Sequence, residues 1–242
     1  MIKYLKLLLF CYSLLAYSQE KLKVNYEVIS KNTKVNFGND FNLSEELKQQ
    51  MLEKIEQQNK EPKKYMLYYY DGNSYFTKDD SSLLGKQKQE YFKIKNQVGF
   101  YILKDFIVEE FYGYYPDNNF EIEYRNETQI IENYTCKLAI VRSSNEINKV
   151  WYTEEIPIST GPFIYNNLPG LVLKVERPNY LCYATHISKD IVENNIKKMN
   201  PDLKIYQGEE LEIKNKEGLQ KRMNHSKELT EMNKKRIMEM YK

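Results

Sequence analysis

The sequence has 242 residues, of which 41% are hydrophobic and 29% charged, a composition that excludes a disordered or collagen-like chain. Its 36 basic and 34 acidic residues nearly balance, which argues against a nucleic-acid-binding surface. The 22 tyrosines are unusually many, and tyrosine favours half-buried positions on β-strands. We therefore expect a β-rich globular protein.

The start of the chain has the pattern of a secretory signal peptide, residues 1–18. Two lysines precede a short apolar run, residues 7–15, and Ala16 and Ser18 are small residues at the −3 and −1 positions of a cleavage site. The run is about half the ~20 residues needed to span a bilayer, which argues against a membrane anchor. The sequence therefore predicts export to the periplasm or the extracellular space, with the outer membrane as a candidate place of association.

Residues 19–213 are expected to form a single β-rich domain. Alternating apolar and polar residues predict a strand at 22–28, and apolar residues at four-residue spacing predict a surface helix over 44–58. Strands then follow one another without helical crossovers, which favours an antiparallel sheet. The expected fold class is α+β, mainly antiparallel β, with one curved sheet, an inserted surface helix and a C-terminal helix. The later strands are expected at 65–70, 74–77, 91–95, 100–103, 107–112, 120–124, 136–140, 150–153, 171–175 and 180–187, with short edge strands at 204–206 and 211–213.

The last part of the chain, residues 214–242, is a polar tail with nine basic and four acidic residues. We expect it to be helical from about residue 216. Its apolar positions fit one helical face only loosely, which favours a solvated terminal helix. The excess of basic residues leaves a peripheral contact with a membrane surface as the alternative.

Removal of the signal peptide leaves two cysteines, Cys136 and Cys182, in an oxidising compartment where thiols can pair. Both occupy predicted strand positions of matching parity, in strands that are candidates for sheet neighbours. A disulfide between them would stabilise the fold by about 4 kcal/mol in the chain-entropy model. Two buried free thiols are the alternative, because Cys is among the most buried residue types.

The segment from residue 157 to residue 170 contains five of the sixteen Gly and Pro residues of the chain. Pro fixes the φ angle and Gly relaxes it, so this loop has a prescribed path, and Pro169 followed by Gly170 predicts a turn. The loop is too apolar to be free, so it either packs on the sheet or forms a surface that a partner covers. We expect Trp151 on the buried face of the sheet and residues 166–168 at an exposed tip. The candidate motif or interaction residues are Trp151, Tyr152, Pro157, Gly161, Pro162, Phe163, Leu168, Pro169 and Gly170.

These fragments also carry a family resemblance. The order W-Y-T-E-E-I-P from residue 151, G-P-F from residue 161 and N-L-P-G-L-V from residue 167 closely resembles the GLPGLI family of exported proteins from Bacteroidota. Residues 134–139 resemble the Y-x-C-x-K-A segment of that family, with Leu138 in place of its Lys. Asn167 and Val172 replace the opening Gly and closing Ile of the motif, and Asn tolerates a positive φ well enough to keep the turn. The resemblance covers roughly residues 22–213 and implies an exported protein, with no agreed catalytic residues to transfer.

Residue types that serve catalysis or metal binding are present without the required spacing. Ser159, His186 and Asp190 are the residue types of a hydrolytic triad, but Ser159 lies in no G-x-S-x-G elbow, so we expect His186 to be an ordinary strand residue. Two distant His and two Cys give no recognised metal-ligand pattern, and the chain has no glycine-rich phosphate loop. We therefore expect no catalytic residues, no metal and no cofactor.

Two functions of different class remain open from the sequence. The first is a non-enzymatic exported envelope protein whose concave, Tyr- and Phe-rich sheet face holds an apolar ligand or an envelope protein partner. The second is a hydrolase of envelope or extracellular polymers, which would need two facing carboxyl groups about 5–10 Å apart. We favour the first, and the partner is not identified by the sequence.

Overall fold

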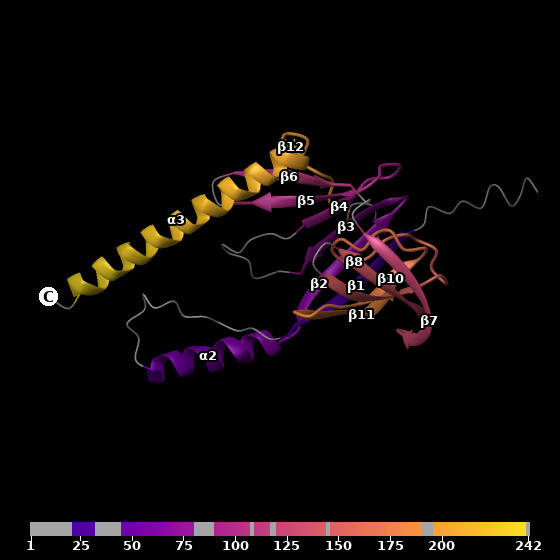
Figure 1. The fold of residues 1–242 in the computed structure, drawn as a ribbon, viewed down its shortest axis with the longest axis horizontal. Helices are drawn as coiled ribbons and strands as arrows, with labels where there is room; N and C mark the ends of the chain where they lie inside the picture. Colours follow the sequence, from indigo (N-terminus) through magenta and orange to yellow (C-terminus); the bar gives the residue numbers. More distant parts are fainter. Residues whose placement is uncertain are drawn as a thin grey trace, which may run out of the picture.

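The computed structural model describes residues 21–31, 45–79, 90–106, 109–116, 120–143, 146–189 and 196–240. The predicted signal peptide therefore lies outside the described residues. Figure 1 shows the elements. The strands are β1 (Lys21–Ser30), β2 (Lys63–Tyr70), β3 (Asn73–Lys78), β4 (Glu90–Lys93), β5 (Phe100–Asp105), β6 (Glu110–Tyr115), β7 (Glu121–Ile131), β8 (Tyr134–Ser143), β9 (Glu146–Thr153), β10 (Leu171–Glu176), β11 (Tyr180–Ser188) and β12 (Ile205–Tyr206), and the helices are α2 (Glu45–Lys60) and α3 (Gly208–Met240).

All twelve described strands belong to one sheet, in the order β12-β6-β5-β4-β3-β2-β1-β11-β10-β9-β8-β7. Neighbouring strands are antiparallel except β12, which pairs with β6 in parallel. Helix α2 is inserted between β1 and β2, and α3 follows the last strand (Figure 1). The expected α+β class with a mainly antiparallel sheet is confirmed.

The β2–β3 hairpin has the tight turn that its sequence predicts. Tyr70 pairs with Asn73, which leaves a two-residue loop in which Asp71 has a φ of 46° and Gly72 a φ of 85°. Positive φ at both central positions matches the right-handed twist of the flanking strands. The ammonium of Lys95 binds the Asp71 carboxylate at 2.7 Å, so a side chain from the next turn holds this hairpin end in place.

The largest core lies inside the curve of the sheet, and the loop between β9 and β10 fills it. Residues 154–170 form this connection, which we call the motif loop. Four of its side chains, Ile156, Ile158, Tyr165 and Leu168, are buried in one cluster with residues of β1, β2, β3, β8, β9, β10 and β11. The expectation of an exposed tip is wrong, because Asn166 is 4% and Leu168 2% exposed. The concave face therefore holds the protein's own loop where we expected a ligand.

The opposite face of β2–β6 has its own aromatic core. Tyr68, Tyr75, Phe92, Leu103 and Tyr112 are buried there in one cluster. The segment before β12 covers this cluster with Ile196, Met199 and Leu203. Strands β2 to β4 therefore pack on both faces, one against the motif loop and the other against residues 196–203, while Phe111 of β6 packs against Leu211 of α3.

Helix α3 begins earlier than the sequence predicts. Gly208 has a φ of 54°, and Leu211 in the first turn is buried with Phe106, Phe111 and Tyr206. The predicted edge strand at residues 211–213 is therefore wrong, because burial of Leu211 against the β5–β6 end makes this segment the first turn of the helix. The edge strand predicted at 204–206 is present as β12.

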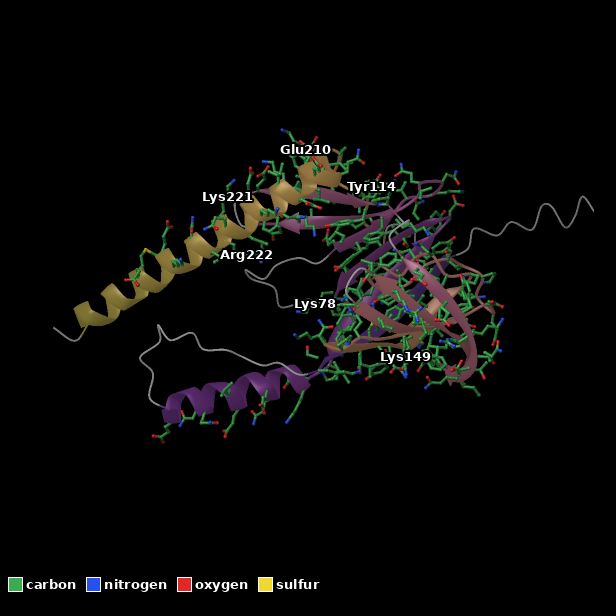
Figure 2. The ribbon with its side chains drawn as sticks, in the orientation of Figure 1. Lys78, Tyr114, Lys149, Glu210, Lys221 and Arg222 are labelled. Atoms are coloured by element: carbon green, nitrogen blue, oxygen red, sulfur yellow. The ribbon has the colours of Figure 1, made fainter. Side chains whose placement is uncertain are left out.

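The first part of α3, from Leu211 to Arg222, contacts the β5–β6 end of the sheet, and the rest of the helix extends away from it (Figure 1). Arg222, labelled in Figure 2, donates to the Asp105 carbonyl at 2.9 Å and lies 5.4 Å from the centre of the Phe106 ring. A Cβ at Gly218 would lie 2.4 Å from the same ring, so only glycine allows this close approach. No helix in the described part of the chain is long and apolar enough to cross a membrane.

Candidate functional site

The motif loop is fixed by hydrogen bonds to the strand that follows it. The amide of Leu171 donates to the Ile156 carbonyl at 3.0 Å, and the amide of Val172 donates to the Thr160 carbonyl at 3.0 Å. The register of β10 against β9 shifts immediately after Val172, which gives β10 a bulge. The motif loop therefore continues the hydrogen bonding to β10 beyond the end of β9.

Two glycines of the motif are required for space. A Cβ at Gly170 would lie 2.0 Å from the Thr153 carbonyl oxygen, and one at Gly161 would lie 2.5 Å from the Tyr165 carbonyl oxygen. Neither glycine has a positive φ. The sequence pattern identified both positions, but the reason is close backbone contact and not a left-handed turn.

Lys93 of β4 supports the buried end of the loop. Its ammonium donates to the Ser159 carbonyl at 2.9 Å and to the Asn166 carbonyl at 2.8 Å. The Ser159 hydroxyl donates to the same Asn166 carbonyl at 2.7 Å. The buried Asn166 therefore has its backbone carbonyl satisfied by two side chains, one of them a lysine distant in the sequence.

Phe163 is the aromatic anchor of the motif loop. It is the only described residue of the loop with a positive φ, at 57°, a conformation that costs energy for a residue with a Cβ. Its ring lies 4.8 Å from Phe76, 5.5 Å from Tyr65, 5.7 Å from Tyr91 and 5.3 Å from Tyr180, measured between ring centres. Edge-to-face contacts of this kind stabilise a buried ring beyond its burial alone, and they hold the backbone in place.

An open pocket of about 320 Å³ lies beside this anchor. Its walls come from β1, β2, β4, β11 and the motif loop, so segments distant in sequence meet there. Four aromatic rings and Ile164 supply apolar surface, and Arg177 and Lys63 supply positive charge. We call it the aromatic pocket, and it is lined by Val28, Ser30, Lys63, Tyr65, Tyr91, Phe163, Ile164, Arg177, Asn179 and Tyr180.

Two tyrosines of the aromatic pocket, Tyr91 and Tyr180, are neutral at physiological pH. Burial raises the pKa of Tyr91 to about 12, with a further upward contribution from Tyr115 and a downward one from Arg177. Burial also raises the pKa of Tyr180, and the neighbouring Arg177 opposes this rise. The phenol groups therefore remain hydrogen-bond donors.

Arg177 is positioned between a carboxylate and an aromatic ring. Its guanidinium forms an ion pair with Glu146 of β9 and lies 5.2 Å from the centre of the Tyr180 ring. A backbone hydrogen bond also closes the turn between β10 and β11, in which the Arg177 amide donates to the Tyr180 carbonyl at 2.9 Å. The pocket thus combines an ordered cation with apolar walls, which suits a ligand that has an apolar group and a polar or anionic group.

The other motif residues have structural contacts outside this pocket. Tyr152 is buried, while Trp151 remains partly exposed and does not take the buried position that we expected. The indole of Trp151 donates to the Glu176 carboxylate at 3.1 Å, and the Lys174 ammonium lies 5.8 Å from its ring centre. Pro157 and Pro169 are exposed, and Pro162 is buried.

The two cysteines are buried free thiols in this structure. The expectation that their strands are neighbours is wrong, because β9 and β10 lie between β8 and β11. Burial raises the pKa of the Cys136 thiol to about 11, with a smaller contribution from Glu155, and burial raises that of Cys182 well above its usual value. Both thiols are therefore protonated and unreactive near neutral pH.

The structure does not assemble a catalytic triad from the three residues considered above. The Ser159 hydroxyl is used by the Asn166 carbonyl, and His186 is exposed on β11. Asp190 lies outside the described residues. Within the described ranges, no group of three or more His, Cys, Asp or Glu residues could hold a metal ion.

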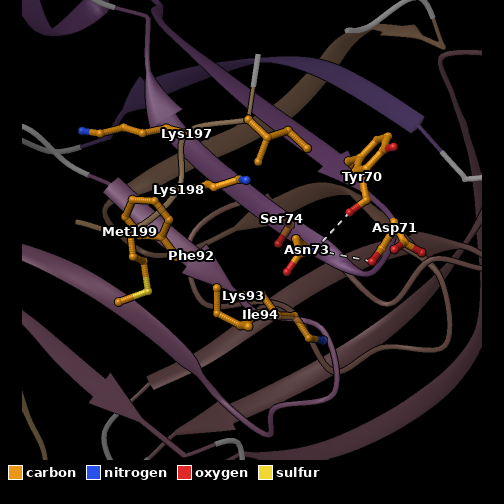
Figure 3. A pocket seen from close by; sticks show the side chains of 11 residues that line it. Tyr70, Asp71, Asn73, Ser74, Phe92, Lys93, Ile94, Lys197, Lys198 and Met199 are labelled. Carbon is orange, nitrogen blue, oxygen red and sulfur yellow. Dashed lines mark hydrogen bonds between the residues drawn. The ribbon is translucent and has the colours of Figure 1, made fainter. Parts of the chain in front are cut away.

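Two further pockets occur in the described part of the chain. One, of about 400 Å³, lies beside the bulge of β7 and contains the Lys137–Glu154 ion pair. The other, of about 390 Å³, lies on the opposite face of β2–β4 from the motif loop, below residues 196–199 (Figure 3). Neither of these pockets, nor the aromatic pocket, is lined by more than one acidic residue.

Sequence reasoning found Phe163 but missed its partners on other strands. Tyr65, Tyr91 and Tyr180 lie on three strands that meet only in the folded sheet, so no local pattern connects them. The available signal was the high number of tyrosines at strand positions. That signal predicts half-buried rings without showing which of them share a pocket.

The fold and the pocket together define a β-rich module with an ordered aromatic site. Residues 116–214 match the family model described as "N-glycanase peptide, N-terminal domain", which is less than half of the chain. The matched range includes β7 to β12, the motif loop and the Arg177–Tyr180 side of the aromatic pocket.

Two crystal structures of PNGF-II have a similar fold. The C2 form gives a TM-score of 0.53 at 16% sequence identity, covering 82% of this chain and 32% of PNGF-II. The P21 form gives the same score and identity, covering 81% and 33%. This chain therefore spans about a third of the length of PNGF-II, and the likeness establishes a shared fold. No curated protein matches the sequence.

Proposed function

We propose that this chain is a non-enzymatic binding module of an exported protein and that the aromatic pocket is its binding site. The observation that carries the proposal is Phe163, an anchor with a strained backbone whose ring forms part of the wall of an open pocket that also contains Arg177 and Lys63. Strained residues persist where the surrounding structure holds them, and they concentrate at binding sites. The motif that resembles the GLPGLI family supplies this residue, and membership of that exported family is part of the proposal, supported by the motif residues themselves.

The ligand of this pocket has an apolar group of modest size. The walls offer rings and aliphatic side chains, and the volume of about 320 Å³ is at the lower end of the range for ligand sites. Arg177 and Lys63 favour a polar or negatively charged group beside the apolar one. A small apolar ligand, or a side chain presented by an envelope protein partner, meets this description.

A sugar-bearing ligand is the second candidate. The observation that favours it is the match of residues 116–214 to the N-terminal domain model of an N-glycanase. A sugar ring has an apolar face that can stack on the tyrosine rings and hydroxyl groups that accept hydrogen bonds from Arg177 and Asn179. Export of this chain is part of the same proposal and is supported by the signal-peptide pattern of residues 1–18.

The hydrolase alternative has less to support it. A retaining or inverting glycosidase needs two carboxyl groups flanking the bond that breaks. The aromatic pocket has no acidic lining residue, and each of the other two pockets has one, Asp71 or Glu154. The carboxylate of Glu154 is paired with Lys137 at 2.6 Å.

Capture from the native cell envelope tests the proposal. The tagged mature protein and its Ile164→Glu variant are incubated with envelope extract, and bound lipids, glycans and proteins are identified by mass spectrometry. Ile164→Glu places a charge on the pocket wall, so a true ligand should be recovered with the unmodified protein and lost with this variant. Ile147→Glu is the matched control, since Ile147 is 63% exposed and lies outside the pocket. Equal recovery by all three proteins would reject the aromatic pocket as the binding site.

A further inference from the structure

A second pocket lies on the other face of β2–β4, and no part of the proposed function uses it. It is bounded by the β2–β3 turn, by the end of β4 and by residues 196–199, and has a volume of about 390 Å³ (Figure 3). Phe92 and Met199 give it an apolar floor that continues into the aromatic core of this face. We call it the Lys198 pocket.

Lys197, the lysine next to Lys198, is held in an ion pair with a buried carboxylate. The Lys197 ammonium lies 2.7 Å from both carboxylate oxygens of Glu90, which is 4% exposed. The Tyr75 hydroxyl donates to the same carboxylate at 3.1 Å. This ion pair fixes residues 196–199 over the sheet, and it leaves Glu90 unable to neutralise another cation.

Lys198 itself has no such partner among the described residues. It is exposed and lines the pocket (Figure 3). The one carboxylate in the lining, that of Asp71, is bound by Lys95 at 2.7 Å. The Lys198 ammonium is therefore a cation at the mouth of an apolar pocket whose only acidic neighbour is already paired.

Asn73 supplies a hydrogen-bond donor to the Lys198 pocket besides the ammonium of Lys198. The side-chain oxygen of Asn73 accepts from the Lys95 amide at 3.0 Å. Its amide nitrogen has only two long contacts, 3.5 Å each, to the carbonyls of Tyr70 and Asp71, which Figure 3 shows as dashed lines. A ligand that supplies acceptor oxygens would satisfy both this amide and Lys198.

We propose that the Lys198 pocket binds a small amphipathic carboxylate, with its apolar chain against Phe92 and Met199 and its carboxylate on the ammonium of Lys198 and the amide of Asn73. Apolar contact supplies the driving force for such a ligand, and the charge-assisted hydrogen bond selects an acid over its neutral analogue. The volume suits a chain of moderate length.

Titration calorimetry of the mature protein with dodecanoate and dodecanol, both below their aggregation limits, tests the proposal. We expect dodecanoate to bind about tenfold more tightly than dodecanol at low salt, and this preference to shrink as the salt concentration rises. Lys198→Gln should remove the preference, Lys198→Arg should keep it, and Lys204→Gln, a change of an exposed lysine on the same segment, should leave it intact.

Backbone amide shifts measured by NMR during the same titration locate the ligand. They should concentrate at residues 70–74, 92–94 and 196–199. Equal affinities for the acid and the alcohol, an unchanged preference in Lys198→Gln, or no binding of dodecanoate would each overturn the proposal. Shifts that concentrate at the aromatic pocket would also overturn it, and would assign the apolar ligand to the other face of the sheet.

Discussion

The ring of Phe163 lies 4.8 Å from the ring of Phe76, at an interplanar angle of 66°. This contact joins the motif loop to the centre of the sheet, across 87 positions of sequence. Phe163 makes this contact from a backbone with a φ of 57°, and the contact offsets part of the cost of that conformation. Phe163 also lines the aromatic pocket.

Loss of this ring should destabilise the fold. Phe163→Ala removes a packed aromatic side chain and keeps the unfavourable φ, so we expect the free energy of unfolding to fall by about 3–5 kcal/mol. Urea denaturation followed by circular dichroism measures this. Ile147→Ala, at a 63% exposed position, should change it by less than about 0.5 kcal/mol. A similar small change for Phe163→Ala would mean that the loop is not anchored by this ring.

Two glycines are required for different reasons: Gly170 for lack of space and Gly208 for its positive φ. Gly170→Ala would place a Cβ 2.0 Å from the Thr153 carbonyl oxygen, and a backbone atom cannot move away easily, so we expect a loss at or above about 3 kcal/mol. Gly208→Ala meets no atom within 4 Å but keeps a φ of 54°, which costs about 1 kcal/mol. Thermal melting of both variants shows which substitution destabilises the fold more. A larger loss at Gly208 would contradict the close packing assigned to the motif.

The hydroxyl of Tyr26 donates to the Val172 carbonyl at 2.6 Å inside the core. Tyr26→Phe leaves this buried carbonyl without its partner, so the free energy of unfolding should fall by about 1–3 kcal/mol. Tyr101→Phe is the matched control, because the Tyr101 hydroxyl donates to Gln97 at the surface. Equal changes in the free energy of unfolding for the two variants would show that the buried hydrogen bond does not stabilise the fold.

The cysteines make stability depend on alkaline pH. The folded-state pKa of Cys136 is about 11, above the value of 9.0 for a free thiol, so the protonated thiol stabilises the fold fully below pH 9.0. This contribution is lost as the pH rises from 9.0 towards 11. The free energy of unfolding should therefore fall over that range, and less steeply in Cys136→Ala. Identical slopes would contradict the assignment.

Thiol titration tests the state of both cysteines. The native protein should react slowly at neutral pH, and the denatured, unreduced protein should show two thiols per chain, since both are free in the structure. Two thiols that appear only after reduction would show instead that Cys136 and Cys182 are joined in a disulfide.

The sequence predicted those elements whose signals are local. The strand β1 follows from alternating apolar residues, and the β2–β3 turn follows from Asp71 and Gly72. The start of α3 was missed because Leu211 and Ile213 alternate like strand residues, while the contact that buries Leu211 comes from Phe106 and Tyr206.

The interior position of the motif loop could not be predicted from local pattern. Asn166 and Asn167 are polar, so the sequence indicated a solvated tip. Asn166 is nevertheless buried, and its carbonyl accepts a hydrogen bond from Lys93, which lies 73 positions earlier. The aromatic pocket was hidden for the same reason, because only the sheet order brings Tyr91 and Tyr180 to the side of Phe163.

The most direct test of the aromatic pocket as the binding site is a titration with the ligand recovered from the envelope. Dissociation constants are measured by calorimetry for the unmodified protein, Ile164→Glu and Ile147→Glu, after circular dichroism has shown that all three are folded. We expect Ile164→Glu to weaken binding by at least about tenfold, equivalent to about 1.4 kcal/mol, and Ile147→Glu to leave the dissociation constant unchanged. Equal dissociation constants for all three folded proteins would contradict the account.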